Sequence, residues 1–498
     1  MNFGVRGRAR AALAPAPLMD RRTDADHVDA LPLSALEDSQ TPSSAEPADV
    51  QDVARWVFVV AALIALADIL AVPWFTHELP NSLVVAALAL AMVGIVADLT
   101  IGPGRAASER WPRLERALVS DRWCAFAVGI LFLAFYAATA SAPTQYNEHV
   151  RLAWALLHGR TWVDAPSYME HVVVGGRSYI LHPPLSAILM LPAVAIWGET
   201  ANQTAVAVVL GAISITLWWR LMDRLGLGAP AKIWLTAFFG VGTTFWYEAT
   251  LGSSWDFALL ASVPFTLAAL GEVFGEARPW VVGLLAALAT LARYDLVMAW
   301  PVYALMLVVR GRRWRDVAWM LPGLAGAALF YVAYNEVRFG TPNDIALWIW
   351  YNQDKYRFAR PGGPFALRDL PFNLYTLLFM APGYSDKFPW IHPEFMGQAL
   401  ILTSPAFILA LRPSFLRPIP ALVLAAAILS SGPSLLVYAS GFAQLGPRYY
   451  VQVYPFLLTL IALGIPRKVD QLSKILVVVS IVLVIFFTWQ VRWYGWGG

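Results

Sequence analysis

The sequence has little cysteine and little charge, and each shortage excludes a class of protein. Its single cysteine, Cys124, excludes an intrachain disulfide and a metal site built from several cysteines. Charged residues make up 14% of the chain, whereas soluble proteins use about 25%. The net charge of +3 is small, and basic patches interleaved with aromatics do not stand out. A large soluble enzyme and a nucleic-acid-binding protein are therefore both disfavoured.

Hydrophobic residues are abundant, at 58% of the chain, and they occur in long runs. Windows of about 20 apolar residues indicate helices that span a bilayer. We predict about thirteen such spans, hence an all-α integral membrane protein. They lie at residues 56–75, 82–102, 123–142, 205–222, 232–249, 256–274, 280–293, 296–309, 317–334, 398–411, 419–438, 449–465 and 475–491.

The first fifty residues differ from the rest. Residues 1–50 are rich in Ala, Pro, Asp and Ser and lack hydrophobic periodicity, which predicts a disordered cytoplasmic tail. Residues 51–498 then form a polytopic transmembrane domain. Cytoplasmic loops carry an excess of Lys and Arg, and this rule sets the orientation.

The basic clusters can all be cytoplasmic under one condition, which is that the apolar piece at residues 183–197 does not cross the membrane. It has only about fifteen residues and contains three prolines, so a re-entrant or interfacial helix suits it better than a span. The outer face then carries two long loops, at residues 145–202 and 336–397. The second loop is rich in Trp, Tyr, Phe and Pro, which argues for ordered structure close to the membrane.

The first outer loop is a polar island in an apolar sequence. It holds four of the seven histidines (His149, His158, His171 and His182) and the acids Glu148, Asp164 and Glu170. Residues 148–157 have the periodicity of an amphipathic interfacial helix. The Gly175-Gly176 pair predicts the turn of a small hairpin. A carboxylate at the membrane boundary can have a raised pKa, as a general base needs, but it can also be an ordinary helix-start acid.

Other side chains of the outer face suit substrate binding. Tyr146 and Tyr168 offer hydroxyls and aromatic faces for sugar rings. His182 stands before two prolines in a rigid corner, where it either contacts a phosphate or has a structural role. No metal-binding spacing such as HExxH accompanies the histidines, so we expect no cofactor and give a divalent metal a low probability.

Arg293 and Arg448 each stand at the edge of a predicted span. Ionisable residues at membrane depth are costly and usually functional, and arginine binds phosphate with two parallel hydrogen bonds. The competing interpretation is that both side chains extend to the interface, with Asp295 as a simple partner of Arg293.

Several motifs appear in a specific order between residues 123 and 465. They are the EHVRLAWALLHG helix, the GGRSYILHPPL corner, the apolar helix that ends at Trp197-Gly198, the YNEVRFGTP segment and the GPRYYVQVYPF segment. Together they resemble the type-C (GT-C) membrane glycosyltransferases, which include the aminoarabinose lipid A transferases and the protein O-mannosyltransferases.

The resemblance implies a sugar donor linked to polyprenyl phosphate and a lipid, glycan or protein acceptor. It also implies an inverting reaction on the periplasmic face of a bacterial inner membrane. The acid that deprotonates the acceptor maps most closely onto Glu148, with Glu170 and Asp164 as alternatives. Relatives often place an Asp slightly earlier, where this chain has Pro143, Thr144 and Gln145. The expected substrate-binding residues are Tyr146, Asn147, Tyr168, His182, Arg293, Lys355, Arg448 and Tyr449.

Two other function classes stay open. A transporter or flippase of lipid-linked sugars usually shows internal repeats and broken helices near the midplane, and no clear repeat is present. A non-catalytic assembly subunit that binds polyprenyl lipids is the other. An enzyme requires a pocket on the outer face where an acid approaches Arg or Lys.

Overall fold

The computed structural model describes residues 122–164, 171–352, 363–386, 390–466 and 468–494. The chain divides into two compact units, Met1–Asp52 and Val53–Gly498, and all of these residues belong to the second unit. The predicted tail and the first two predicted spans, residues 56–75 and 82–102, lie outside the described residues.

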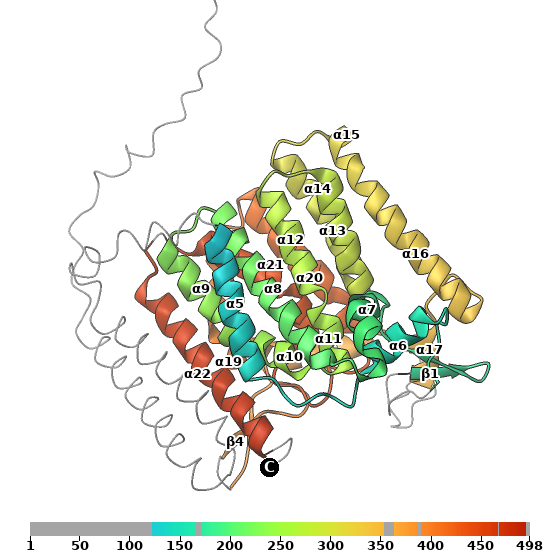
Figure 1. Cartoon of the computed structure of the whole chain (residues 1–498). Coiled ribbons are helices and arrows are strands. Elements are labelled where there is room, and N and C mark those ends of the chain that lie inside the picture. Colours follow the sequence, from blue (N-terminus) through green and yellow to red (C-terminus); the bar gives the residue numbers. More distant parts are fainter. Residues whose placement is uncertain (1–121, 165–170, 353–362, 387–389, 467, 495–498) are drawn as a thin grey trace, which may run out of the picture. The chain divides into compact units, whose positions relative to one another are not determined.

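Helices dominate the described part of the chain (Figure 1). The α-helices are α5 (Arg122–Ala138), α6 (Glu148–Leu157), α7 (Leu185–Trp197), α8 (Gln203–Arg224), α9 (Ala229–Val241), α10 (Phe245–Leu251), α11 (Ser254–Leu260), α12 (Val263–Phe274), α13 (Pro279–Ala292), α14 (Trp300–Val309), α15 (Trp314–Val317), α16 (Leu321–Phe339), α17 (Ala346–Asn352), α18 (Leu370–Leu378), α19 (Leu400–Thr403), α20 (Pro418–Leu436), α21 (Tyr454–Gly464) and α22 (Gln471–Tyr494).

Short 3-10 helices and two small sheets complete the described part. The 3-10 helices are η2 (Gly198–Thr200), η3 (Tyr294–Ala299), η4 (Ala318–Met320), η5 (Leu367–Asp369), η6 (Pro405–Leu411) and η7 (Arg448–Val453). The strands β1 (His171–Val174) and β2 (Arg177–Ile180) pair antiparallel, as do β3 (Gly383–Tyr384) and β4 (Ile391–His392).

Five helical segments are long and apolar enough to cross a membrane. They are Gln203–Arg224, Ser254–Phe274, Trp314–Phe339, Pro418–Leu436 and Gln471–Arg492. Shorter apolar helices stand beside them, such as Cys124–Ala138 and Pro279–Ala292. The predicted all-α architecture is confirmed and is compatible with a multi-pass membrane protein, whereas the count of thirteen spans stays a prediction.

Several predicted spans are not single continuous α-helices, and two of them show a local cause. The predicted span at residues 232–249 is broken between α9 and α10, where Gly240 and Gly242 precede two threonines. A Cβ at Gly240 would lie 2.1 Å from the ring of Phe132, so the glycine lets α5 approach closely. The predicted span at residues 398–411 consists of α19 and η6, because Pro405 cannot donate the next helical hydrogen bond.

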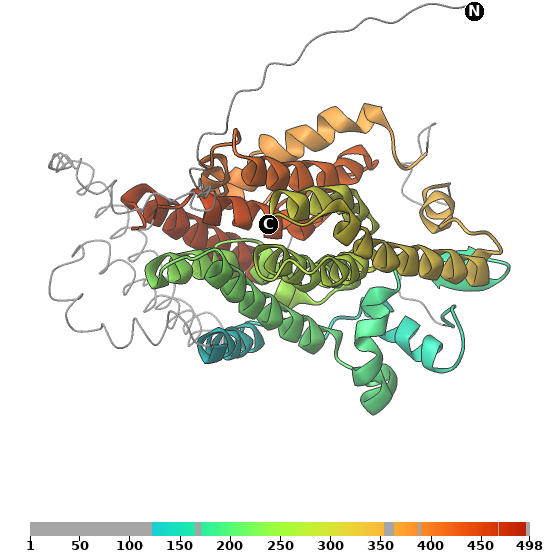
Figure 2. The same ribbon diagram turned by 90° about the horizontal axis from the view of Figure 1, so that it is seen from above.

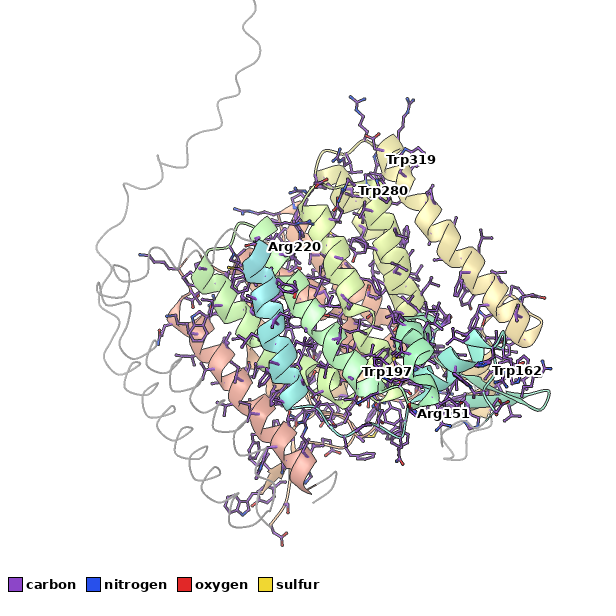
Figure 3. The ribbon with its side chains drawn as sticks, in the orientation of Figure 1. Arg151, Trp162, Trp197, Arg220, Trp280 and Trp319 are labelled. Carbon is purple, nitrogen blue, oxygen red and sulfur yellow. The ribbon has the colours of Figure 1, made fainter. Side chains whose placement is uncertain are left out.

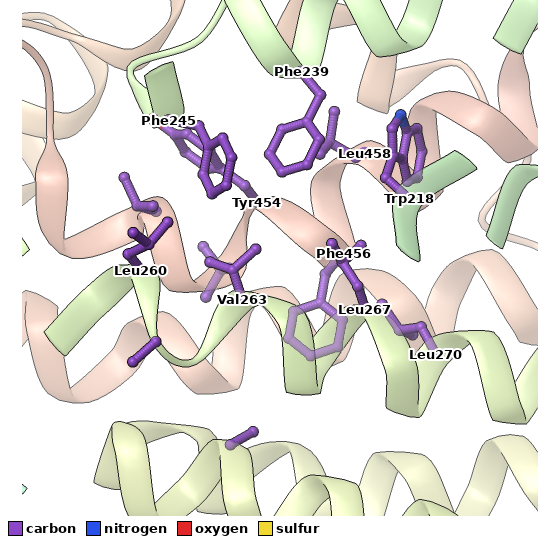
Figure 4. Packing of buried hydrophobic residues seen from close by; sticks show 14 of the residues in the cluster. Trp218, Phe239, Phe245, Leu260, Val263, Leu267, Leu270, Tyr454, Phe456 and Leu458 are labelled. Atoms are coloured by element: carbon purple, nitrogen blue, oxygen red, sulfur yellow. The ribbon is translucent and has the colours of Figure 1, made fainter. Parts of the chain in front are cut away.

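The core consists of large side chains brought together from distant parts of the sequence. Trp218, Phe239 and Phe245 pack near Tyr454 and Phe456 from α21 (Figure 4). Glycines also permit a close contact between helix backbones: a Cβ at Gly283 of α13 would lie 2.6 Å from the Met320 carbonyl oxygen. Small residues at such contacts are typical of helix packing in membranes.

The first outer loop forms the elements that its sequence predicts. The amphipathic helix is α6, the Gly175-Gly176 turn joins β1 to β2, and the apolar proline-flanked piece is α7. Helix α7 ends at Gly198, whose φ of 60° is a conformation that favours glycine. These elements gather at one end of the long helices (Figure 1). That α7 is a re-entrant or interfacial helix stays a prediction.

The second outer loop meets the first at this same end. Val172 and Tyr179 of the hairpin form a small cluster with Ala346 of α17, against which Phe339 of α16 packs. Seen from above, the hairpin lies beside the end of α16 (Figure 2). Arg151, Trp162 and Trp197 mark this end, whereas Arg220, Trp280 and Trp319 mark the other (Figure 3). That separation fits the predicted sidedness of the loops.

Candidate functional site

A cavity of about 460 Å³ lies where the two outer loops meet the helix ends. Its walls come from the His182-Pro183 corner, η3, α16, α17, α20 and η7, which are far apart in the sequence. The lining residues are Leu181, His182, Pro183, Trp255, Arg293, Tyr294, Asp295, Met298, Tyr331, Asp344, Leu347, Trp348, Trp350, Phe365, Pro433, Ser434, Val437, Tyr438, Arg448 and Tyr449. The structure therefore brings four residues singled out from the sequence, His182, Arg293, Arg448 and Tyr449, to one cavity.

A hydrogen-bond network fixes one cation and one acid in the cavity wall. Arg293 donates from Nε to Oε1 of Gln452 at 2.8 Å and from Nη2 to Oδ2 of Asp295 at 3.3 Å. The same carboxylate oxygen accepts from Nε2 of Gln452 at 2.9 Å and from Oγ of Ser434 at 3.0 Å. Asp295 is therefore the partner of Arg293, as its sequence position suggested, and Gln452 holds both ends of the pair.

Arg448 presents a different electrostatic situation. It is 8% exposed, and it forms no ion pair with a carboxylate of the described residues. Its Nη1 donates to the Phe442 carbonyl at 3.2 Å, and its guanidinium lies over the rings of Trp255 and Tyr449. Its Nε has no hydrogen-bond partner. The charges of the buried acids Asp256 and Glu248 act on this guanidinium, but its Nε leaves one hydrogen-bond donor for an anionic ligand.

His182 lines the cavity, and His149 packs against it from outside the lining, with ring centroids 5.2 Å apart. His149 bonds through Nε2 to the Ser254 carbonyl at 2.8 Å, and burial lowers its pKa to about 4. Burial also lowers the pKa of His182 well below its usual value, with added effects from the charges of His149, Arg293 and Arg448. Both rings are therefore neutral at neutral pH, and His182 can serve as a polar wall without adding charge.

Arg338 of the YNEVRFGTP segment ties the two outer loops together. Its Nη2 donates to the Ile180 carbonyl at the end of the hairpin, at 2.5 Å. Its Nη1 lies 3.6 Å from Oδ2 of Asp344, whose Oδ1 accepts from the Ala346 backbone at the start of α17. Asp344 lines the cavity, as do Trp348 and Trp350 of α17. Arg338 thus positions the aromatic wall of the cavity against the His182 corner.

Glu148, the acid closest to the expected base position, lies at the buried start of α6. Its backbone N–H donates to Oγ of Ser254 at 2.8 Å, which places it next to α11. It is not among the cavity-lining residues, but the adjacent His149 packs on His182, which is. The ring of Tyr146 packs against that of the cavity residue Trp255 at an interplanar angle of 45°, with centroids 4.8 Å apart.

Asn147 and Asp164 belong to a second pocket, on another side of α6. Three further candidates, Tyr168, Glu170 and Lys355, lie outside the described residues. The structure also adds residues to the site. Asp295 was considered only as a partner of Arg293, and Asp344 was not singled out, although both carboxylates line the main cavity. A signal for Asp344 was its place directly after the YNEVRFGTP segment.

The described residues hold no group of three or more His, Cys, Asp or Glu that could bind a metal ion. No protein-family model, no curated protein and no solved structure matches this chain. The functional assignment therefore depends on the chemistry of the cavity.

Proposed function

We propose that this chain is a membrane glycosyltransferase of the cell envelope. It moves a sugar from a polyprenyl-phosphate donor to a lipid, glycan or protein acceptor, with inversion, on the periplasmic side of a bacterial inner membrane. The order of the motifs that resemble type-C glycosyltransferases supports the reaction type. The apolar helices and the sidedness of the basic loops support the location.

The observation that carries the proposal is the pair of arginines in an aromatic cavity. Arg448 is buried without a carboxylate partner, and Arg293 is held by Gln452 and Asp295. A phosphate would accept from the Nε of Arg448, which has no hydrogen-bond partner, because guanidinium groups bind phosphate oxygens with charge-assisted hydrogen bonds. Trp348, Trp350 and Tyr438 in the same wall offer flat apolar surfaces for a sugar ring.

In the proposed reaction, the acceptor hydroxyl oxygen attacks the anomeric carbon of the donor. The bond between that carbon and the phosphate oxygen breaks, and its electron pair remains on the phosphate. The arginines stabilise this developing charge. A carboxylate takes the hydroxyl proton; Glu148 is the first candidate, Glu170 is an alternative, and Asp295 and Asp344 stand in the cavity wall, whereas Asp164 lies in the second pocket. This divides the work as in other inverting sugar transfers.

The test is transfer by the purified full chain in lipid nanodiscs. The chain would be incubated with a panel of polyprenyl-phosphate sugars and a cell-envelope extract that supplies acceptors. We expect acceptor-dependent release of polyprenyl phosphate from one donor, and release that is slower by about 10²–10³-fold with Arg448→Ala. Movement of an unaltered donor between leaflets, without release, would identify a flippase. Donor binding without release or movement would identify a binding subunit.

A further inference from the structure

The second pocket has a volume of about 390 Å³ and lies beside α6. One face of that helix, with the residue before it, forms one wall, the loop after it forms another, and η2 contributes a single side chain. The lining residues are Asn147, Arg151, Trp154, Ala155, Arg160, Val163, Asp164 and Glu199. The volume falls in the range of about 300–1,000 Å³ that is typical of ligand sites.

The charges of this pocket balance. Two of its lining residues are arginines and two are acids, so their formal charges sum to zero. Arg160 and Asp164 form an ion pair, and Arg151 donates from Nε to Oδ1 of Asn147 at 2.9 Å. An anionic ligand would meet the two carboxylates and a cation would meet the two guanidinium groups. A neutral ligand rich in hydroxyls can use both the donors and the acceptors.

Trp154 gives the pocket an aromatic surface that neighbouring groups hold in place. Its ring stands against η2, where a Cβ at Gly198 would lie 3.6 Å from it, and its centroid is 4.2 Å from that of His158. A flat ring beside balanced polar groups suits the apolar face of a pyranose. A hydroxyl-rich ring is therefore the chemistry that the pocket fits.

Helix α6 separates this pocket from the main cavity. Its buried side carries Glu148 and His149, and the His149 ring packs on the cavity residue His182. The pocket side carries Arg151 and Trp154. We propose that the second pocket binds a neutral sugar unit of the acceptor, away from the hydroxyl that reacts. The role in acceptor binding rests on the proposed transferase activity, whereas carbohydrate binding by the pocket does not.

Direct binding tests the pocket independently of any reaction. The full chain in phosphatidylcholine nanodiscs would be probed by saturation-transfer NMR with the methyl glycosides of glucose, mannose and galactose. We expect transfer of saturation to at least one glycoside. Trp154→Ala and Asp164→Ala should each weaken this binding by about tenfold, because they remove the stacking surface and a hydroxyl acceptor. Asp164 is largely exposed, so its variant keeps the test valid even if Trp154→Ala fails to fold.

A matched control is available on the neighbouring helix. Trp197 of α7 is 60% exposed and does not line the pocket, so Trp197→Ala should leave glycoside binding unchanged. Absence of binding by all three glycosides, or binding that both pocket variants retain, would overturn the proposal. Binding of phosphatidylglycerol in place of the glycosides would also overturn it, since that would identify an anionic headgroup site.

The outcomes separate this inference from the proposed reaction. Glycoside binding that the pocket variants lose, in a chain that transfers no sugar, would support the pocket and remove its acceptor role. Sugar transfer with an acceptor KM that both variants leave unchanged would refute the pocket and keep the reaction. If both hold, the acceptor KM should rise by about tenfold in each pocket variant.

Discussion

The two ends of the long helices differ in how their buried charged side chains are paired. At the end remote from the cavity, Lys232 forms an ion pair with Asp223, although the lysine side chain is fully buried. Glu272, which is 4% exposed, accepts from the backbone, Nε and Nη2 of Arg278 at 2.8–3.0 Å. At the cavity end, Arg448 is buried among aromatic rings and carbonyls without an ion pair to the described carboxylates.

We infer from this difference that the ion-paired charges stabilise the fold, whereas the charge of Arg448 is placed to bind a ligand. Loss of one partner from a buried pair leaves the other charge uncompensated, so paired charges hold structure. Arg448 is affected by the charges of Asp256 and Glu248 but forms no ion pair with a described carboxylate, and its Nε has no hydrogen-bond partner. The remote end therefore suits a structural role, and the cavity end, where Arg293 is paired and Arg448 is not, suits a binding site for an anion.

The largest expected effect concerns the proton acceptor. Glu148→Gln should reduce sugar transfer by about 10⁴-fold, the upper range for loss of a general base, while donor binding persists. Asp295→Asn is the matched variant, since it changes an acid that lines the cavity and holds Arg293. Single-turnover transfer would be measured for both. Full activity of Glu148→Gln together with an inactive Asp295→Asn would move the base assignment to Asp295.

The second prediction compares one arginine from each end. Arg448→Ala should lower transfer by about 10²–10³-fold, the usual effect of losing one group that stabilises developing negative charge, and it should weaken donor binding. Arg412→Ala removes a cation of the remote end that pairs with Asp470, so transfer should stay near wild type. Donor titrations of both variants measure this. Equal losses in the two would show that the arginines act only through stability.

For thermal stability, we expect the variant at the remote end to have the larger effect and the variant at the cavity end the smaller one. Arg278→Met strips the buried Glu272 carboxylate of its main partner and should cost about 2 kcal/mol, because two charge-assisted hydrogen bonds disappear and Arg278 is half-exposed. Arg448→Met removes a buried cation that forms no ion pair with a described carboxylate, so it should lower Tm less than Arg278→Met does in the absence of donor. Thermal unfolding in detergent micelles reports both changes. An equal or larger fall in Tm for Arg448→Met would contradict the contrast between the two ends.

The sequence predicts the local elements of the first outer loop well. Helix α6 begins at Glu148 and ends at Leu157, as its apolar periodicity indicates, and the Gly175-Gly176 pair marks the hairpin turn. The break between α9 and α10 could not be predicted, because residues 232–249 form one apolar run. Helix α9 ends at its C-cap, Gly242, and the chain becomes helical again only after Thr244, the N-cap of α10.

The candidate site was partly predictable for a different reason. His182, Arg293 and Arg448 carry no common local pattern, but their predicted sidedness placed them on one face, and the fold places them in one cavity. Asn147 and Asp164 belong to another pocket, because α6 turns their side away from the cavity. The distribution of basic residues predicts on which face of the membrane a residue lies, whereas the direction of its side chain depends on packing in the folded chain.

The smallest expected effect is the response of the two ends to mild acid. Burial lowers the pKa of His149 to about 4, from 6.5, so below pH 6.5 the unfolded chain binds a proton that the folded chain does not. Stability therefore falls as the pH drops, by about 1 kcal/mol between pH 7 and pH 5.5 for this group.

Asp470 at the remote end behaves differently over that range. Its hydrogen bond from Arg412 holds its pKa below the usual 3.8, so its contribution is present above that value and is lost only at lower pH. His149→Gln should therefore flatten the loss of Tm between pH 7 and pH 5.5, whereas Asp470→Asn should lower Tm by the same amount at both values. Chemical unfolding at the two pH values gives the free energies directly. An unchanged pH slope in His149→Gln would show that another group at the cavity end, with the neutral His182 as the nearest, takes up the proton.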